Sequence, residues 1–316
     1  MDKNKSKTAI YKPRFRLYFL KPKYWWIWFI FIMLFLLSKI PGLVLNYLLK
    51  LFSATLYLLA RRLRKRAEIN LLQCMPELTY EEKRKIICDM FYVGLQSTAT
   101  LFSLRFQRKN INFDEIRWHG YDIIKELRNK GDNVILIVPH MLAMEILGLA
   151  LGYKGINIAA MVRLSGNEVI DYLVNLTRQR FNLQIHSNDA GVNSFIHSVR
   201  NGKWGYYLPD MDFGSKRGVF VNFFATYKST LPIIGRLAEI CNSKIVPVYP
   251  VFDIDSHTIN IYISQPLDDL NKSDKLTQAR RLNEIIECFI SKHPEQYNWM
   301  LKFLKTRKDG EENIYK

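Results

Sequence analysis

The fold is decided by residues 134–140, which read Val134-Ile135-Leu136-Ile137-Val138-Pro139-His140. Five consecutive apolar residues, most of them β-branched, predict a strand buried on both faces, as in a parallel sheet. After the histidine the chain reads Met141-Leu142-Ala143-Met144-Glu145 and continues as an apolar, helix-like segment. His140 is therefore expected between the end of a buried strand and the start of a helix, where ligands gather in such sheets.

The same alternation of strand and helix extends on both sides of this stretch, which predicts an α/β fold with a largely parallel mixed sheet flanked by helices. Further strands are expected at 156–162, 204–208, 218–223 and 245–252, and 258–264 alternates like an edge strand. Helices are expected at 121–130, 141–152, 167–181, 190–201, 230–242 and 274–292. Residues 67–110 form a helical lead-in, in which Thr79 is a candidate N-cap with Glu81 and Glu82 in the first turn.

The chain is strongly basic. Its 316 residues include 46 Lys and Arg against 29 Asp and Glu, which leaves a formal net charge of +17. Such a charge favours an anionic partner, whether nucleic acid, an acidic membrane surface, or an acidic protein or substrate. The four cysteines lie far apart without a CxxC pair, and no HExxH spacing occurs, so neither a disulfide scaffold nor a metal site is indicated. A reducing compartment fits this pattern.

The position of the charge favours a membrane over nucleic acid. Basic residues, Lys3, Lys5 and Lys7 among them, precede an uncharged run at 24–37 that opens with three tryptophans. The apolar segment 43–60 and the basic cluster 61–66 follow. Tryptophans beside apolar runs with basic flanks are typical of a membrane interface. We therefore interpret residues 1–66 as a membrane-anchoring helical segment and 67–316 as the α/β domain.

The first apolar run is too short for a clear membrane span. About 20 apolar residues are needed to cross a bilayer, and extending the run would bring Lys39 and Pro41 into the membrane. No cleavage site for a signal peptide follows it. A helix inserted in the cytoplasmic leaflet is the simpler interpretation, and a short single span stays open.

His140 and Glu145 are the candidate catalytic pair. Five positions apart on a regular helix they would lie about 140° apart, so they meet only if His140 precedes the helix. A carboxylate on one imidazole nitrogen fixes the tautomer and leaves the other nitrogen to take a proton from a hydroxyl. No GxSxG elbow indicates a serine nucleophile. A histidine at a strand end can also be a structural hydrogen-bonding residue, and both interpretations stay open on this pattern alone.

A resemblance to a known family adds to this. His140-x4-Glu145 resembles the HxxxxD/E motif of the glycerolipid acyltransferase superfamily, and from Lys21 onward the chain resembles its bacterial branch of lipid A biosynthesis acyltransferases, which add secondary lauroyl or myristoyl chains. The matching elements, in order, are Pro22-Lys23-Tyr24-Trp25-Trp26, Asn70-Leu71, Met75-Pro76-Glu77-Leu78, Val162-Arg163, Arg178-Gln179-Arg180, Pro209-Asp210-Met211-Asp212-Phe213-Gly214, Pro294-Glu295-Gln296-Tyr297-Asn298-Trp299 and Lys305-Thr306-Arg307.

The resemblance implies an acyltransferase that moves a fatty acyl chain from an acyl carrier protein thioester to a hydroxyl of a phosphorylated lipid A precursor. His140 would be the general base and Glu145 its orienting partner. The implied location is the bacterial inner membrane, with the catalytic domain facing the cytoplasm. No metal, cofactor or nucleic acid is implied. A sister acyltransferase with a lysophospholipid or glycosylated lipid acceptor, or a non-enzymatic lipid-binding protein, are the alternatives.

Three arginines and one aspartate are candidate substrate-binding residues. Arg163 follows a predicted strand and matches a substrate-binding block of the family, so it would hold a phosphate or stabilise charge at the thioester carbonyl. Arg178 and Arg180 end the next helix, where they would serve either a phosphate or the helix dipole. Asp210 and Asp212, two positions apart, could hold a divalent ion, but turn geometry, in which Asp side chains bond nearby backbone amides, is the favoured explanation of the pair. The resemblance also makes Asp210 a candidate contact for the acceptor head group.

Overall fold

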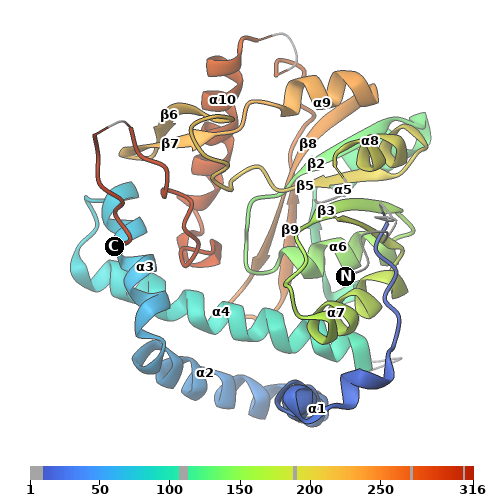
Figure 1. Ribbon diagram of the computed structural model, residues 1–316, viewed down its shortest axis with the longest axis vertical. Coiled ribbons are helices and arrows are strands. Elements are labelled where there is room, and N and C mark those ends of the chain that lie inside the picture. Colours follow the sequence, from blue (N-terminus) through green and yellow to red (C-terminus); the bar gives the residue numbers. More distant parts are fainter. Residues whose placement is uncertain (1–9, 107–112, 188–190, 271–272, 309) are drawn as a thin grey trace, which may run out of the picture.

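The computed structural model describes residues 10–106, 113–187, 191–270, 273–308 and 310–316. Its centre is a sheet with the strand order β1-β9-β8-β2-β5-β3-β4 (Figure 1). The strands are β1 Arg117–His119, β2 Asn133–Ile137, β3 Ile158–Val162, β4 Leu183–Ser187, β5 Trp204–Tyr207, β8 Ser243–Phe252 and β9 Ile259–Ile263. Strands β8, β2, β5, β3 and β4 run parallel, and β9 runs antiparallel to β8. The expected α/β fold with a largely parallel mixed sheet is confirmed.

One expectation about the sheet was wrong. The segment 258–264 was predicted as an edge strand because apolar and polar residues alternate in it, but β9 lies between β8 and β1. The edge is formed by the three residues Arg117–His119, which pair in parallel with Asn260, Ile261 and Tyr262. A strand this short carries no periodicity of its own, so the sequence did not indicate that it covers β9.

Helices cover both faces of the sheet and fill two cores. The α-helices are α1 Trp25–Leu37, α2 Gly42–Leu59, α3 Arg61–Cys74, α4 Tyr80–Phe106, α5 Tyr121–Lys130, α6 Met144–Tyr153, α7 Glu168–Arg180, α8 Asn193–Arg200, α9 Ile234–Cys241 and α10 Lys275–Ile290. Val134, Leu136 and Val138 pack in one core with residues of α5 and α6. Ile135 and Ile137 face the opposite core, with residues of α8, α9 and α10. This alternation explains why residues 134–138, which include all of β2 after Asn133, are apolar.

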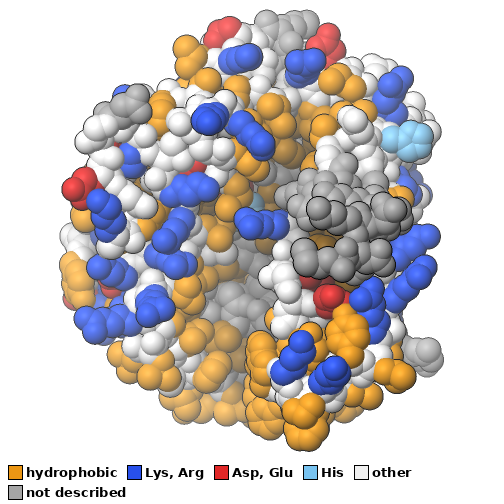
Figure 2. Space-filling view, in the orientation of Figure 1, with side chains coloured by type: hydrophobic (Ala, Val, Ile, Leu, Met, Phe, Trp, Pro, Cys, Tyr) orange, Lys and Arg blue, Asp and Glu red, His pale blue; other side chains and the backbone are white. Residues whose placement is uncertain are grey.

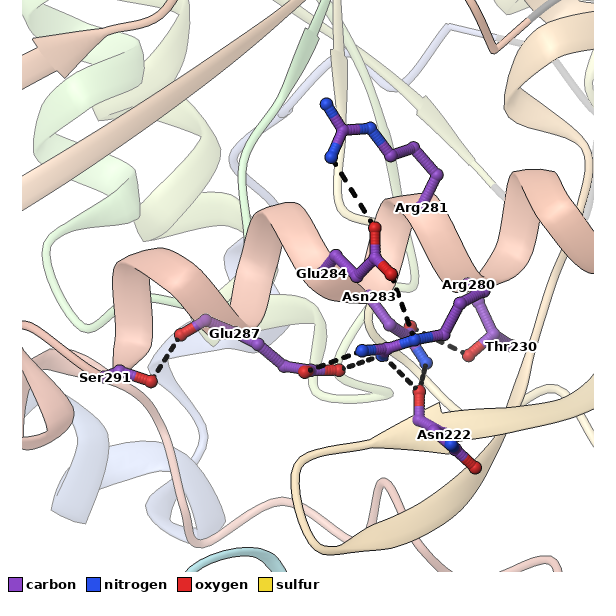
Figure 3. A network of polar contacts seen from close by, with 8 residues as sticks. All are labelled: Asn222, Thr230, Arg280, Arg281, Asn283, Glu284, Glu287 and Ser291. Carbon is purple, nitrogen blue, oxygen red and sulfur yellow. Dashed lines mark hydrogen bonds and ion pairs between the residues drawn. The ribbon is translucent and has the colours of Figure 1, made fainter.

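A two-stranded hairpin outside the main sheet is held by α10. Its strands are β6 Val219–Phe223 and β7 Thr226–Thr230. Figure 3 shows the polar contacts that join the hairpin to the helix. Asn283 Nδ2 and Arg280 Nη1 each donate to the carbonyl oxygen of Asn222 over 2.8 Å, and the Thr230 hydroxyl donates to Asn283 Oδ1 over 3.0 Å. These contacts fix the position of β7 relative to the sheet, which matters for the site below.

The N-terminal helices lie against the long helix α4 (Figure 1). Gln96 of α4 donates to Asn46 of α2 over 2.8 Å. Thr79 caps α4 as expected, in a capping box in which its backbone N–H donates to Glu82 Oε2 and its hydroxyl accepts from the Glu82 N–H. Lys3, Lys5 and Lys7, expected near the membrane, lie outside the described residues. The helix α3 runs through position 66, where the sequence placed the end of the anchoring segment.

Large apolar side chains of α1 and α2 are exposed. Trp25, Trp26 and Phe29 are more than half exposed on α1, as are Leu43 and Leu51 on α2. In the described part of the chain α2, with 18 residues, is the one helix that is long and apolar enough to cross a membrane; α1 is shorter. Figure 2 shows hydrophobic side chains along the lower edge of the molecule, over these helices, and a hollow above them with Lys and Arg at its side.

Candidate active site

His140 is paired with Asp210. The segment Val138-Pro139-His140 follows β2, and the helix α6 begins only at Met144. The histidine therefore precedes the helix, as the sequence predicts. Its Nδ1 lies 2.6 Å from Asp210 Oδ1, and its backbone N–H donates to Asp210 Oδ2 over 2.7 Å. The Asp210 side chain is completely buried, whereas the histidine is 17% exposed. The carboxylate therefore fixes both the backbone and the ring of His140 and leaves Nε2 as the nitrogen that can meet a ligand.

Burial and charge act in opposite directions on Asp210. Burial works to raise the pKa of this carboxyl, but the charge and hydrogen bond of His140, followed by the charge of Lys228, outweigh it and lower the pKa to about 2. Asp210 is thus a carboxylate over the whole physiological range and accepts the proton on Nδ1 of His140. A neutral imidazole held in this way carries its lone pair on Nε2, which is the form that a general base needs.

The C-terminal segment forms the other side of the histidine. The backbone N–H of Asn298 donates to the carbonyl oxygen of His140 over 3.1 Å, and the N–H of Leu142 donates to the carbonyl oxygen of Gln296 over 2.8 Å. Tyr297 and Trp299 are fully buried, so they pack this segment onto the core. The stretch 294–299, one of those that resemble the family, thus holds the loop that carries His140.

Glu145 pairs with Arg178 and not with His140. Arg178 Nε donates to Glu145 Oε2 over 3.0 Å, and its Nη2 forms an ion pair with Glu145 Oε1. This differs from the expected contact between Glu145 and the histidine, because Glu145 lies in the first turn of α6 and its side chain reaches α7. Burial works to lower the pKa of Arg178, but the Glu145 carboxylate raises it above the usual value. The pair joins the two helices beside the histidine.

The other predicted substrate-binding residues do not gather at one point. Arg163 directly follows β3 and is exposed at the same carboxyl-terminal edge of the sheet as His140. Arg180 instead donates from Nη1 to the carbonyl oxygen of Leu104 over 3.1 Å, so it anchors α7 to α4. Asp210, expected near an acceptor head group, is buried beneath His140.

Asp212 has a structural position. Its Oδ1 accepts from the Gly214 N–H over 2.9 Å, which confirms the expected turn. It also binds the C-terminal segment, because Thr306 donates to it from both the backbone N–H and the hydroxyl over 2.7 Å. Throughout the described residues, no group of three or more His, Cys, Asp and Glu side chains is arranged to hold a metal ion.

The pairing of His140 with Asp210 escaped the sequence analysis, although a signal was present. The chain leaves β2 as Val138-Pro139-His140 and leaves β5 as Leu208-Pro209-Asp210. These two strands are parallel neighbours, and Ile137 is opposite Tyr207. A repeated strand–proline–polar pattern on two buried strands therefore indicates two side chains at one sheet edge. Lys228, which lies near Asp210, had no such signal, because a lysine in a short strand is usually exposed.

Comparison with known proteins identifies the family of the chain. The family model for "Bacterial lipid A biosynthesis acyltransferase" matches residues 12–306. The chain is 39% identical to the lipid A biosynthesis myristoyltransferase of Escherichia coli K12, over 99% of this chain and 97% of that protein. It is 39% identical to lipid A biosynthesis acyltransferase 2 of Shigella flexneri over the full length of both chains, and 34% identical to a lipid A biosynthesis acyltransferase of Haemophilus influenzae over 96% of this chain and 94% of that protein. With a match across nearly all of its length and a site of this kind, the chain belongs to the bacterial lipid A biosynthesis acyltransferase family.

Proposed function

We propose that this acyltransferase moves a fatty acyl chain from an acyl carrier protein thioester to a hydroxyl of a lipid A precursor, the 3-hydroxyl of an already attached hydroxyacyl chain. The observation that carries the proposal is the buried Asp210 carboxylate on Nδ1 of a partly exposed histidine at the carboxyl-terminal edge of the sheet. This arrangement suits proton abstraction from a hydroxyl that binds at Nε2.

The reaction proceeds by direct attack. The acceptor hydroxyl oxygen forms a bond to the thioester carbonyl carbon while His140 Nε2 takes the hydroxyl proton, and the N–H at Nδ1 stays bonded to Asp210. The tetrahedral intermediate then collapses, the carbon–sulfur bond breaks, and the imidazolium returns the proton to the leaving thiolate. The aspartate stabilises the imidazolium between these two steps. No covalent enzyme intermediate and no cofactor enters the scheme.

Glu145 contributes through Arg178. This two-point ion pair, with Arg178 largely buried, holds the first turn of α6 against α7 and so fixes the loop on which His140 stands. Glu145 is thereby a positioning residue in the proposed scheme, and Asp210 takes the orienting role on the imidazole that the sequence assigned to Glu145.

Arg163 is proposed to read the acceptor. Its guanidinium is exposed directly after β3, at the sheet edge shared with His140. A phosphate of the lipid A precursor, or the developing oxyanion of the thioester, is a suitable partner for a guanidinium in this place. Arg178 and Arg180 are engaged with Glu145 and Leu104, so they support helix packing in this scheme.

The exposed apolar faces of α1 and α2 are proposed to lie in the cytoplasmic leaflet of the inner membrane. Leu43 is 84% exposed and Leu51 is 61% exposed, while the other side of α2 packs on α4. The helix α4 carries charged residues along its first half. If α2 crossed a bilayer together with α4, on which it packs, those charges would be buried in the membrane. Insertion in the plane of the membrane avoids this cost, with the exposed Arg61, Arg62 and Lys65 on anionic lipid.

The test uses the purified full-length protein in detergent or bilayers. Acyl carrier proteins loaded with lauroyl or myristoyl chains are offered with a phosphorylated lipid A precursor, a lysophospholipid or a glycosylated lipid, and the products are identified by mass spectrometry. We expect transfer to the lipid A precursor and a loss of about 10²–10⁴-fold in His140→Ala. Preferred transfer to another lipid would show that the protein is a sister acyltransferase. Activity retained in His140→Ala would show that His140 is not the general base.

A further inference from the structure

Lys228 is the feature of the site that the reaction scheme does not explain. It is the only completely buried lysine within the described ranges, and its Nζ has no hydrogen-bond partner there. The nitrogen lies 5.3 Å from the centre of the Phe223 ring. Moving an ammonium from water into the protein interior costs a free energy of several kcal/mol unless negative charge lies close by. Its position is therefore informative about what surrounds it.

Two buried carboxylates lie near this ammonium. Asp210 and Asp212 follow β5, two positions apart, and both are almost completely buried. The hydroxyl of Ser229, the residue after Lys228, donates to the carbonyl oxygen of Gly214 over 3.1 Å, so β7 lies directly against the loop that carries both aspartates. The polar contacts of the hairpin with α10, shown in Figure 3, keep β7 in this place.

The titratable groups around Lys228 support a charge-balancing role. Burial lowers the pKa of Lys228 to about 8, and the carboxylates of Asp210 and Asp212 and the neighbouring Cys74 oppose this decrease. Burial raises the pKa of the Cys74 thiol, which is therefore uncharged. The two aspartates are thus the anions that face the lysine at neutral pH.

The two carboxylates differ in what else they bind. Asp212 is held by Thr306 and Gly214, in contacts that brace the C-terminal segment. Asp210 is held by His140, in the contact that sets the imidazole. Whether Lys228 serves catalysis or only folding therefore depends on which aspartate it balances.

We propose that Lys228 is a positioning residue for His140, because its buried ammonium keeps Asp210 as the carboxylate that accepts the proton on Nδ1. The inference rests on the proposed general-base role of His140. Without the ammonium, Asp210 would gain a proton more readily and would donate it to Nδ1. The hydrogen of the neutral imidazole would then move to Nε2, and the ring could no longer take a proton from the acceptor hydroxyl.

The test is a pair of double-mutant cycles on the purified full-length enzyme, measured as acyl transfer at saturating substrates. In the wild type and in Asp212→Asn, we expect Lys228→Met to lower kcat about tenfold or more. KM should be nearly unchanged, because Lys228 is completely buried. In Asp210→Asn we expect kcat to be about 10²-fold lower already. In this background Lys228→Met should lower kcat by less than about twofold, because the carboxylate on which the lysine acts is gone.

Folding is controlled within the same set of variants. The double variants Lys228→Met/Asp210→Asn and Lys228→Met/Asp212→Asn remove one charge of each sign, so they keep the cluster balanced even where Lys228→Met alone does not fold. Each is compared with its own single aspartate variant, and thermal unfolding is recorded for all. Lys244→Met is the matched control, because this lysine stands on β8 in an exposed pair with Asp268.

The outcomes separate the two proposals. Equal losses from Lys228→Met in all backgrounds, or a coupling to Asp212 alone, would overturn the role of Lys228 as a positioning residue. Activity retained in His140→Ala would instead overturn the general-base scheme, whatever the cycles give. A loss in Lys228→Met that disappears only in the Asp210→Asn background, with His140→Ala inactive, supports both.

Discussion

His140 and Asp210 meet because β2 and β5 are parallel neighbours in a register that continues beyond the strands. Ile135, Leu136 and Ile137 lie opposite Gly205, Tyr206 and Tyr207, and the same offset brings the histidine ring to 2.6 Å from the aspartate. Two positions after each strand, a proline precedes the polar residue. The proposed catalytic pair is therefore an extension of the sheet, and its geometry is set by the same strand register.

Asp210 should make the stability of the protein depend on pH in the acid range. Its pKa is about 2 in the folded protein against an ordinary 3.8, so its ionised form stabilises the fold fully above pH 4. That stabilisation, about 2 kcal/mol, is lost as the pH falls from about 4 towards 2. The measurement is the free energy of unfolding of the wild type and of Asp210→Asn between pH 2.5 and 7. The difference between them should narrow below pH 4, and a constant difference would contradict the prediction.

The Glu145–Arg178 pair should affect stability and activity together. Glu145→Gln leaves a largely buried guanidinium without its anion and should lower the free energy of unfolding by about 2–3 kcal/mol. The double change Glu145→Gln/Arg178→Met should recover part of this loss of stability but not the activity, because the first turn of α6 is no longer held. Asp122→Asn, which breaks an exposed pair with Lys125, should change stability by less than about 0.5 kcal/mol. Independent, additive effects at the two positions would show that they do not act as a pair.

The exposed face of α2 should bind lipid. Leu43→Glu combined with Leu51→Glu places two charges on highly exposed apolar positions and should strongly reduce flotation with vesicles that contain anionic phospholipid. Arg61→Lys with Arg62→Lys is the control that keeps the charge, and it should bind like the wild type. Unreduced flotation of the glutamate variant would place the membrane contact elsewhere. Arg64 is left out of the control because its Nη1 donates to the carbonyl oxygen of Tyr57 over 2.8 Å.

The variant Arg163→Lys should show whether Arg163 binds the acceptor or only the anionic membrane surface. Arg163→Lys keeps the net charge but loses the planar, two-pronged geometry with which a guanidinium binds phosphate. We expect transfer to a phosphorylated precursor to fall about tenfold or more, and transfer to its dephosphorylated analogue to fall much less. Both are measured at matched salt. Equal losses on the two acceptors would favour a role at the thioester carbonyl, and no loss would remove Arg163 from the site.

The sequence alone determined the class of fold and the position of the histidine. The continuous apolar run 134–138 requires a strand covered on both sides, and helices of matching length follow, so the α/β architecture and the place of His140 at a strand end are consequences of local pattern. The same holds for the N-terminal helices, whose tryptophans and basic flanks indicate a membrane before any contact is known.

Only the tertiary structure decided which carboxylate meets the histidine. Glu145 is nearer along the chain, but the direction of the first turn of α6 gives it to Arg178, and the register between β2 and β5 brings Asp210 from 70 positions away. Likewise, the short strand β1 forms the sheet edge in place of β9. The hairpin β6–β7 places Lys228 in a buried position beside the aspartates. Contacts between distant segments depend on strand order and packing direction, and local periodicity carries neither.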